Sequence, residues 1–387
     1  MAKLSPRLSN IEESQTLLFD KKAKDMKRQG IDVISLGAGE PDFATPENIK
    51  LAAKKAIDSD FTKYTDTAGI PELREAICRK LHKDNNIQYE SDEIIVSCGA
   101  KHSIYNLCQA LLGKGDEVII PVPYWVSYSE QVKLADATPV FAETDDFQLT
   151  AENISRKITK KTKLIMLNSP NNPTGAVIEK KELQKIAELA VKKQIHVMSD
   201  EIYEKIIYGK KHYSIASLNE SIKALTLTVN GFSKSFSMTG WRLGYAAGPK
   251  GIISAMIKLQ GQMTSNPTSI SQKAGVEALN GPQQSVENMR KQFEERRNYL
   301  VARLNKIPGI KCKMPDGAFY AFADISGIEK DSMKFSLSLL EKGKIAVVPG
   351  VAFGSDGHIR ISYATSMDNI TKALDRIESF VKNYKEL

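Results

Sequence analysis

The segment NGFSKSFSMTGWRLGY, residues 230–245, combines a lysine, several hydroxyl side chains and an arginine directly after the apolar run ALTLTV. Lys234 lies between two serines, one of them Ser233, and eight positions ahead of Arg242. A buried lysine beside another cation has a lowered pKa, so it can act as a nucleophile and form a Schiff base. The segment therefore predicts a site that holds a phosphate and presents an amine. The alternative is an ordinary solvated loop lysine.

Two further apolar runs end on residues suited to binding. Ala100 and Lys101 follow EIIVSCG and begin a predicted helix, whose free N–H groups and dipole favour an anion. Trp125 follows EVIIPVPY and offers a flat apolar face to an aromatic ring. Taken alone, each has a simpler explanation: a plain helix start with a solvated lysine, and a tryptophan buried in the core.

Polar residues follow two more apolar runs. Asn172 lies in NSPNNPTG, residues 168–175, which is rich in turn-forming residues directly after the run KLIMLN. Asp200 ends the run HVMSD, where an unpaired carboxylate would be costly to bury. It therefore either caps a helix or pairs with a cation such as a protonated ring nitrogen. Tyr203, three residues on, can reach the same site by helical spacing.

These residues require a sheet that brings strand ends together. Seven apolar runs (EIIVSC, EVIIPV, TPVFAE, KLIMLN, HVMSD, ALTLTV and GYAAG) alternate with helical stretches, which predicts βαβ units and a mostly parallel sheet between helices. Functional residues of such α/β folds gather at the carboxyl ends of the strands. GAFYAFADI, IAVVPG and HIRISYA indicate a smaller α+β unit. We expect an N-terminal arm with part of the small domain in residues 1–45, a large cofactor-binding domain in 46–285 and a small domain in 286–387.

The composition is ordinary for a globular protein: 387 residues, 42% hydrophobic and 26% charged, with a formal net charge of +8. Basic residues alternate with acids along stretches such as KQFEERRNYLVARLNK, which is typical of a solvated helix face and not of a nucleic-acid interface. The four cysteines show no metal-ligand spacing. No apolar run approaches the roughly 20 residues of a membrane helix. We expect a cytoplasmic protein with no metal, no nucleic acid and no membrane segment.

The motifs SPNNPTG, SDEIY and NGFSKSFSMTGWRLGY, in this order, resemble the pyridoxal-phosphate-dependent class I aminotransferases of fold type I. Within that family the sequence is most similar to the bacterial aspartate aminotransferase branch. SLGAGEPDF, KYTDTAGIPELREA, PYWVSY and GHIRISYA extend the resemblance over nearly the whole chain.

The resemblance implies a pyridoxal 5'-phosphate site and gives the residues roles. By it, Lys234 binds the cofactor covalently and, once substrate displaces it, moves a proton. Asp200 keeps the pyridine nitrogen protonated, so that the ring accepts electrons. Tyr203 and Asn172 hydrogen-bond the phenolic oxygen of the ring, and Trp125 stacks on the ring.

The remaining implied contacts are to the phosphate and to the substrate. The phosphate would be held by Ala100, Lys101, Ser233 and Arg242. Tyr64 would reach the phosphate of the neighbouring subunit, so the resemblance implies a homodimer with shared active sites. Arg360 would bind the substrate α-carboxylate in a bidentate pair, and Gly39 would close over it. Trp125 and Asn172 would also line the substrate.

The implied reaction is transamination from L-aspartate to 2-oxoglutarate, which gives oxaloacetate and L-glutamate. One alternative is a sibling aminotransferase acting on aromatic amino acids, alanine or prephenate. Another is a carbon–sulfur lyase on the same fold, which would release pyruvate without an added keto acid. A non-catalytic cofactor-binding module of a regulator would need a DNA-binding segment, which we do not find in the sequence.

Overall fold

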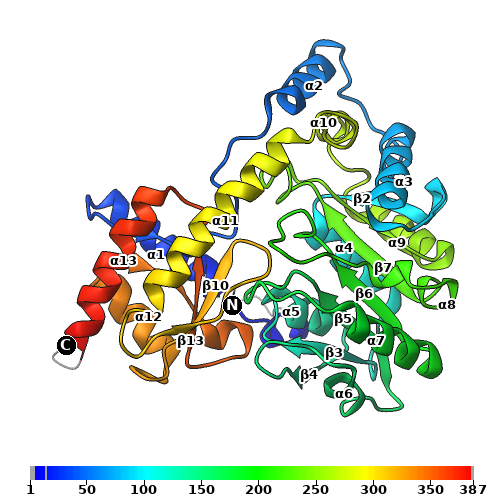
Figure 1. Ribbon diagram of the computed structural model, residues 1–387. Coiled ribbons are helices and arrows are strands. Elements are labelled where there is room, and N and C mark those ends of the chain that lie inside the picture. Colours follow the sequence, from blue (N-terminus) through cyan, green and yellow to red (C-terminus); the bar gives the residue numbers. More distant parts are fainter. Residues whose placement is uncertain (1–4, 14, 385–387) are drawn as a thin grey trace.

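The structure is a computed structural model that describes residues 5–13 and 15–384 (Figure 1). Its larger sheet consists of β2 (Ile94–Ser97), β3 (Glu117–Val122), β4 (Thr138–Glu143), β5 (Thr162–Asn168), β6 (His196–Asp200), β7 (Thr226–Gly231) and β8 (Gly244–Ala247). The strand order is β2-β8-β7-β6-β5-β3-β4, and only β8 runs antiparallel to its neighbours. These strands are the seven apolar runs of the sequence, so the predicted mostly parallel α/β sheet is confirmed.

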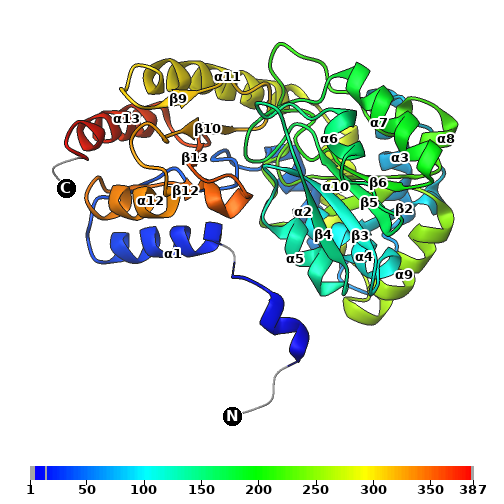
Figure 2. The ribbon, with the colours of Figure 1, turned by 90° about the horizontal axis from the view of Figure 1, so that it is seen from below.

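Helices cover both faces of this sheet (Figure 2). One face carries α4 (Ala100–Leu111), α5 (Ser127–Leu134) and α9 (Lys250–Met263). The other face carries α3 (Pro71–Asn85), α6 (Ala151–Ser155), α7 (Lys180–Lys193), α8 (Glu220–Lys223) and α10 (Ser269–Asn280). Helix α2 (Glu47–Asp58) packs on α10, away from the sheet (Figure 1). Short 3-10 helices are η1 (Pro6–Asn10), η2 (Ser91–Glu93), η3 (Ile215–Ser217) and η4 (Gly350–Phe353).

A smaller antiparallel sheet stands beside the larger one (Figure 1). Its strands, in the order β12-β13-β10-β9, are β9 (Lys311–Cys312), β10 (Tyr320–Asp324), β12 (Val348–Pro349) and β13 (His358–Ser362). The helices around it are α1 (Gln15–Arg28), α11 (Gln284–Leu304), α12 (Ser332–Glu341) and α13 (Met367–Lys382). Phe19 and Ala23 of α1 pack against Leu340 and Ala346, and β1 (Ile34–Ser35) pairs in parallel with β11 (Ile345–Ala346). The first segment of the chain therefore lies against the last.

Helix α7 and strand β7 illustrate why the sequence folds into these layers. The buried residues of α7 are Leu183, Ile186, Ala187 and Ala190, whose spacing gives one apolar stripe along the helix. Every residue of β7 is buried, because this strand lies between β6 and β8 and has helices over both faces. Among the described residues, no helix is both long and apolar enough to cross a membrane.

Candidate active site

All but one of the residues singled out in the sequence line a single cavity of about 310 Å³. They are Gly39, Ala100, Lys101, Trp125, Asn172, Asp200, Tyr203, Ser233, Lys234, Arg242 and Arg360. The carboxyl ends of β6 and β7 and the start of α4 form one wall, and β10 and β13 of the smaller sheet contribute the other. The exception is Tyr64, whose side chain is 88% exposed and does not line this cavity.

Lys234 lies in the turn after β7, with its amine directed into the cavity. The amine donates a hydrogen bond to the carbonyl oxygen of Gly39. Burial lowers the pKa of Lys234 to about 8, and the guanidinium groups of Arg360 and Arg242 contribute to the decrease. An amine with a pKa near neutrality is available as a nucleophile and can take up and return a proton.

Asp200 ends β6 and is almost fully buried. The Tyr128 hydroxyl donates to its Oδ2 over 2.6 Å, and the Ile202 N–H donates to its Oδ1 over 3.2 Å. Burial raises the pKa of Asp200 to about 6, although both hydrogen bonds act in the opposite direction. A cation bound beside this carboxylate would offset the cost of burying its charge.

Arg360 on β13 is 2% exposed, yet its guanidinium retains hydrogen-bonding capacity. Nη1 donates to the Asn172 side chain over 3.0 Å, and Nη2 donates to the Gly37 carbonyl over 2.8 Å. Its Nε has no hydrogen-bond partner among the described residues. The Tyr320 ring lies 4.4 Å from the guanidinium carbon and fixes its plane. This geometry suits the binding of a carboxylate.

The start of α4 is shaped to receive an anion. Gly99 precedes the helix with a φ of +89°, and a Cβ there would lie 2.6 Å from Arg242 Nη2. A Cβ on Gly244 would lie 2.2 Å from the Ala100 nitrogen, so β8 approaches the helix start closely. Arg242 Nη1 donates to the Thr239 carbonyl over 2.7 Å. Two glycines thus let an arginine and free backbone N–H groups face the same space.

Lys101 and Trp125 form a pair at the cavity wall. The Lys101 ammonium lies 4.9 Å from the centre of the Trp125 ring, over its face. Trp125 also packs edge-on against Tyr128, with 5.3 Å between ring centres. The Trp125 ring therefore lines the cavity. The simpler alternative, a tryptophan buried in the core, does not apply.

Sequence reasoning missed two tyrosines of this cavity. Tyr128 holds Asp200, and the Tyr320 hydroxyl lies 2.9 Å from the Tyr203 hydroxyl. The only available signal for Tyr128 was its place in PYWVSY, three residues after Trp125 in the direction of a helix. No local pattern marks Tyr320, because its partner is 117 residues away.

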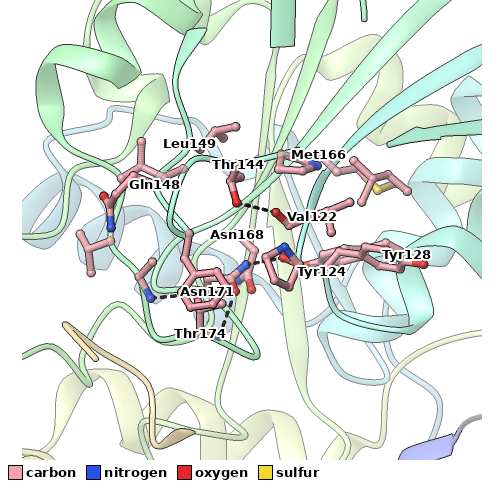
Figure 3. A pocket seen from close by; sticks show the side chains of 17 residues that line it. Val122, Tyr124, Tyr128, Thr144, Gln148, Leu149, Met166, Asn168, Asn171 and Thr174 are labelled. Carbon is pink, nitrogen blue, oxygen red and sulfur yellow. Dashed lines mark hydrogen bonds between the residues drawn. The ribbon is translucent and has the colours of Figure 1, made fainter. Parts of the chain in front are cut away.

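The asparagine-rich turn after β5 was singled out for Asn172, but its neighbours set its shape. Asn168 donates to the Asp200 carbonyl over 3.0 Å and accepts from the Asn172 N–H over 2.8 Å. Asn171 donates to the Pro123 carbonyl over 3.3 Å and accepts from the Thr174 hydroxyl over 2.9 Å (Figure 3). These contacts surround a second cavity of about 30 Å³, which shares Tyr128 and Asn168 with the larger one. The turn therefore links Asn172 rigidly to the strand that carries Asp200.

The cavity joins a half-buried amine, a buried carboxylate and a buried guanidinium, which suits an enzyme that acts on small amines or carbonyl compounds carrying a carboxylate. The model of the family "Aminotransferase class I and II" matches residues 31–377. This protein belongs to that family, and the resemblance inferred from the sequence motifs is confirmed.

Three relatives illustrate the match. Aspartate aminotransferase of Bacillus sp. (strain YM-2) is 51% identical, over 98% of this chain and 99% of the relative. A probable aspartate/prephenate aminotransferase of Rickettsia bellii is 50% identical, over 98% of both chains. The crystal structure of the Rhizobium meliloti aspartate aminotransferase aligns with a TM-score of 0.96 at 43% identity and covers 99% of both chains.

Proposed function

We propose that this protein is a pyridoxal 5'-phosphate-dependent aspartate aminotransferase, which converts L-aspartate and 2-oxoglutarate into oxaloacetate and L-glutamate. The observation that carries the proposal is the convergence of Lys234, Asp200 and Arg360 on one cavity. The full-length similarity to aspartate aminotransferases of several bacteria supports it.

The residues present fit this cofactor. Within residues 5–13 and 15–384, buried Asp200 accepts hydrogen bonds from neutral donors only, and a protonated pyridine nitrogen would supply a cation beside it. The start of α4 with Arg242 suits a phosphate group, and Lys234 supplies the amine for covalent attachment. When bound, pyridoxal phosphate provides an electron sink for the negative charge that develops on the α-carbon of the amino acid.

The protein's own residues would then handle the proton and the substrate charge. The Lys234 amine, with its pKa of about 8, takes the proton from the α-carbon of the amino acid and holds it for return. Arg360 binds the α-carboxylate and fixes the amino acid in one orientation. Tyr128 keeps Asp200 in place through its hydrogen bond.

The positive charge of the protein favours a dicarboxylate substrate. Besides Lys234, its lining carries the cations Lys101, Arg242 and Arg360, against the single carboxylate of Asp200. A phosphate dianion and one α-carboxylate would together balance these three cations, so the attraction for a second carboxylate on the substrate would come from the positive field of the whole protein, whose net charge is +8. Aspartate, glutamate and their oxo acids have that second carboxylate, whereas alanine and phenylalanine lack it.

A homodimer with shared active sites is part of the proposal. Tyr64, in the loop between α2 and α3, does not line the cavity of its own subunit and is the most exposed large aromatic side chain described. Leu51 and Ile57 on α2 and Met263 at the end of α9 are also exposed large apolar residues. These residues suit an interface through which Tyr64 reaches the phosphate in a partner subunit.

The four free cysteines support a cytoplasmic location. Burial raises the pKa of Cys78 to about 11 and those of Cys108 and Cys312 to about 12. Such thiols are poorly reactive and need no disulfide, which suits a reducing compartment.

Steady-state assays of the purified, cofactor-loaded protein test the proposal. With 2-oxoglutarate as acceptor, we expect kcat/KM to be highest for L-aspartate and at least roughly tenfold lower for alanine and phenylalanine. Prephenate with an amino donor tests the activity that the name of the Rickettsia bellii relative describes. Pyruvate release without any keto acid would identify a carbon–sulfur lyase instead, and the absence of aspartate turnover would contradict the proposal.

A further inference from the structure

A buried network of charged and polar side chains lies beside the cavity but does not line it. We call it the backing network; its members are Lys80, Asn85, Glu201, Glu204, His212, Ser214 and Asn230. They come from α3, from the segment after β6, from the loop before η3 and from β7. None of them has a part in the proposed chemistry. Burying so many polar groups is costly unless they are paired, so their arrangement calls for an explanation.

Glu201 is completely buried and is surrounded by donors. Its Oε2 lies 3.0 Å from His212 Nε2 and accepts from the Ser214 hydroxyl. Its Oε1 accepts from the Ser199 hydroxyl over 2.9 Å, and Asn85 Nδ2 lies 3.3 Å from Oε2. A carboxylate with this many partners is held in one position.

Glu204 is bound as tightly by a different set of donors. The Lys80 ammonium pairs with its Oε1, and Asn230 Nδ2 donates to the same oxygen over 2.9 Å. Asn85 donates to Oε2 over 2.6 Å. Although burial alone would raise it, the attraction of Lys80 brings the pKa of Glu204 to about 2. The Glu204 carboxyl group is therefore charged at neutral pH.

The network is electrically balanced when His212 carries a proton. Burial opposes that charge, but Glu201 raises the pKa of His212 above its ordinary value. The other ionised groups around His212 are Glu204 and Lys80, together with Asp84, Lys180 and Lys211 along the adjoining cavity. Glu201, Glu204 and His212 could together ligate a metal ion, but the Lys80 ammonium already neutralises Glu204. We therefore interpret the cluster as a closed ion-pair network.

Members of the network alternate along the chain with residues of the cavity. Glu201 directly follows Asp200, and Glu204 directly follows Tyr203. Asn230 lies at the end of β7, four residues before Lys234. Asp200 and Tyr203 therefore each precede a residue that is anchored in the network, and Lys234 follows such a residue at a distance of four positions. Glu201 is also among the groups that raise the pKa of Asp200, after burial.

We propose that the backing network positions Asp200, Tyr203 and Lys234, and that its balanced charge sets the proton affinity of the group bound to Lys234. Its charged members are then positioning residues of the active site. This inference rests on the proposed cofactor-dependent function.

Two substitutions change the network charge in opposite directions with little change of shape. Glu204→Gln leaves the network one charge more positive, and Lys80→Met leaves it one charge more negative. Positive charge disfavours a protonated state nearby, and negative charge favours it. In the cofactor-loaded protein, the visible absorbance of the bound cofactor should change with pH as the group bound to Lys234 loses its proton. We expect the pH midpoint of this change to fall by roughly half a pH unit in Glu204→Gln and to rise by a similar amount in Lys80→Met.

The double variant Lys80→Met/Glu204→Gln restores neutrality and should return the midpoint to that of the wild type. Glu188→Gln, at an exposed position on α7, is the matched control and should not move it. If the network only stabilised the fold, the two single variants would not be expected to shift the pH midpoint in opposite directions, and the double variant would not be expected to restore it. Equal midpoints in all variants, or shifts of the same sign in both single variants, would overturn the proposal.

Nuclear magnetic resonance of the cofactor-free protein separates this inference from the proposed function. The His212 signal is identified among those of the five histidines as the one that His212→Gln removes. In the wild-type protein, we expect the titration midpoint of His212 to lie above the ordinary histidine pKa of about 6.5. In Glu201→Gln, we expect this midpoint to fall below 6.5, roughly the ordinary pKa. A wild-type protein that binds no pyridoxal phosphate would refute the proposed function alone. A His212 midpoint at or below the ordinary value would refute the charge balance, whatever the cofactor.

Discussion

In the proposed function Lys234 has the most demanding task among the residues of the cavity, because one amine would both attach a carbonyl group and move a proton. Its buried position beside two guanidinium groups lowers its pKa, so that the neutral form is accessible near neutral pH. The same position explains why few substitutes would serve: arginine stays protonated and methionine has no basic nitrogen.

We predict that Lys234→Ala lowers kcat for aspartate by at least roughly 10³-fold, because attachment and proton transfer are both lost. The variant should fold normally and retain the phosphate contacts at the start of α4. Lys185→Ala, at an exposed position of α7, is the matched control and should keep wild-type activity. Comparable turnover by the Lys234 variant and the control would contradict the role of this amine.

Tyr128→Phe removes the 2.6 Å hydrogen bond to Asp200 without changing the packed ring. A hydrogen bond to a charged group contributes roughly 1.5–3 kcal/mol, so kcat/KM should fall by about 10- to 100-fold. Tyr124→Phe changes a tyrosine that lies four residues earlier, before α5 and outside the larger cavity, and serves as the control. If both variants behave alike in the aspartate assay, Tyr128 does not act through Asp200.

Site residues could be predicted from the sequence where their type rarely has a purely structural role at such a position. Lys234 and Asp200 are charged residues at the ends of apolar runs, where burial is costly and calls for a chemical reason, whereas Arg360 was assigned through the family resemblance. Tyr128 and Tyr320 could not be predicted, because tyrosine packs in most protein cores. Only the fold brings their hydroxyl groups within hydrogen-bonding distance of Asp200 and Tyr203.

At the scale of elements, the junction between β2 and α4 makes the most specific structural demand. The backbone turns at Gly99 with a positive φ, and the Arg242 guanidinium lies beside this turn at the start of α4. β8 presses against the same point through Gly244. The anion site therefore depends on two positions that accept no side chain.

Gly99→Ala should weaken cofactor binding, because the added methyl group would meet the Arg242 guanidinium and strain the backbone. We expect the dissociation constant for pyridoxal phosphate to rise roughly tenfold or more, corresponding to a strain of about 1–2 kcal/mol. Equilibrium dialysis or fluorescence quenching measures it. Gly113→Ala, where a Cβ would meet no atom within 4 Å, is the control. Unchanged affinity in Gly99→Ala would show that this junction does not hold the phosphate.

The longer apolar strands could be predicted from the sequence, whereas the two-residue strands could not. IAVVPG reads as one strand, yet it forms β11 and β12, two residues each, in different sheets. β11 pairs with β1 from the start of the chain, more than 300 residues away. Pairing over such a separation depends on the complete fold and leaves no local pattern in the sequence.

At the scale of the whole molecule, residues of both sheets line the cavity, although the larger sheet is formed by residues 94–247 and the smaller one by residues 311–362. The two sheets lie side by side (Figure 1). The predicted boundary at residue 285 falls in the first turn of α11, Gln284–Leu304. The division into an arm with part of the small domain, a large domain and a small domain remains a prediction.

Mixed dimers test whether Tyr64 acts across a subunit interface. Lys234→Ala and Tyr64→Ala should each be strongly impaired as pure dimers. A dimer with one subunit of each kind has one intact site, so random exchange should restore roughly a quarter of the wild-type activity. No recovery, with exchange verified by mass spectrometry, would indicate that Tyr64 does not serve the partner's site.

The central claim is that this protein transfers the amino group of L-aspartate to 2-oxoglutarate. The two half-reactions, measured separately, test it most directly, because they distinguish amino transfer from every other fate of aspartate. The purified, cofactor-loaded protein is mixed with L-aspartate and no acceptor, and oxaloacetate is quantified. After removal of free aspartate, 2-oxoglutarate is added and L-glutamate is quantified. Our account predicts a single equivalent of oxaloacetate per subunit in the first step and a single equivalent of glutamate in the second. Continuous product formation without an acceptor, or no glutamate after 2-oxoglutarate, would contradict it.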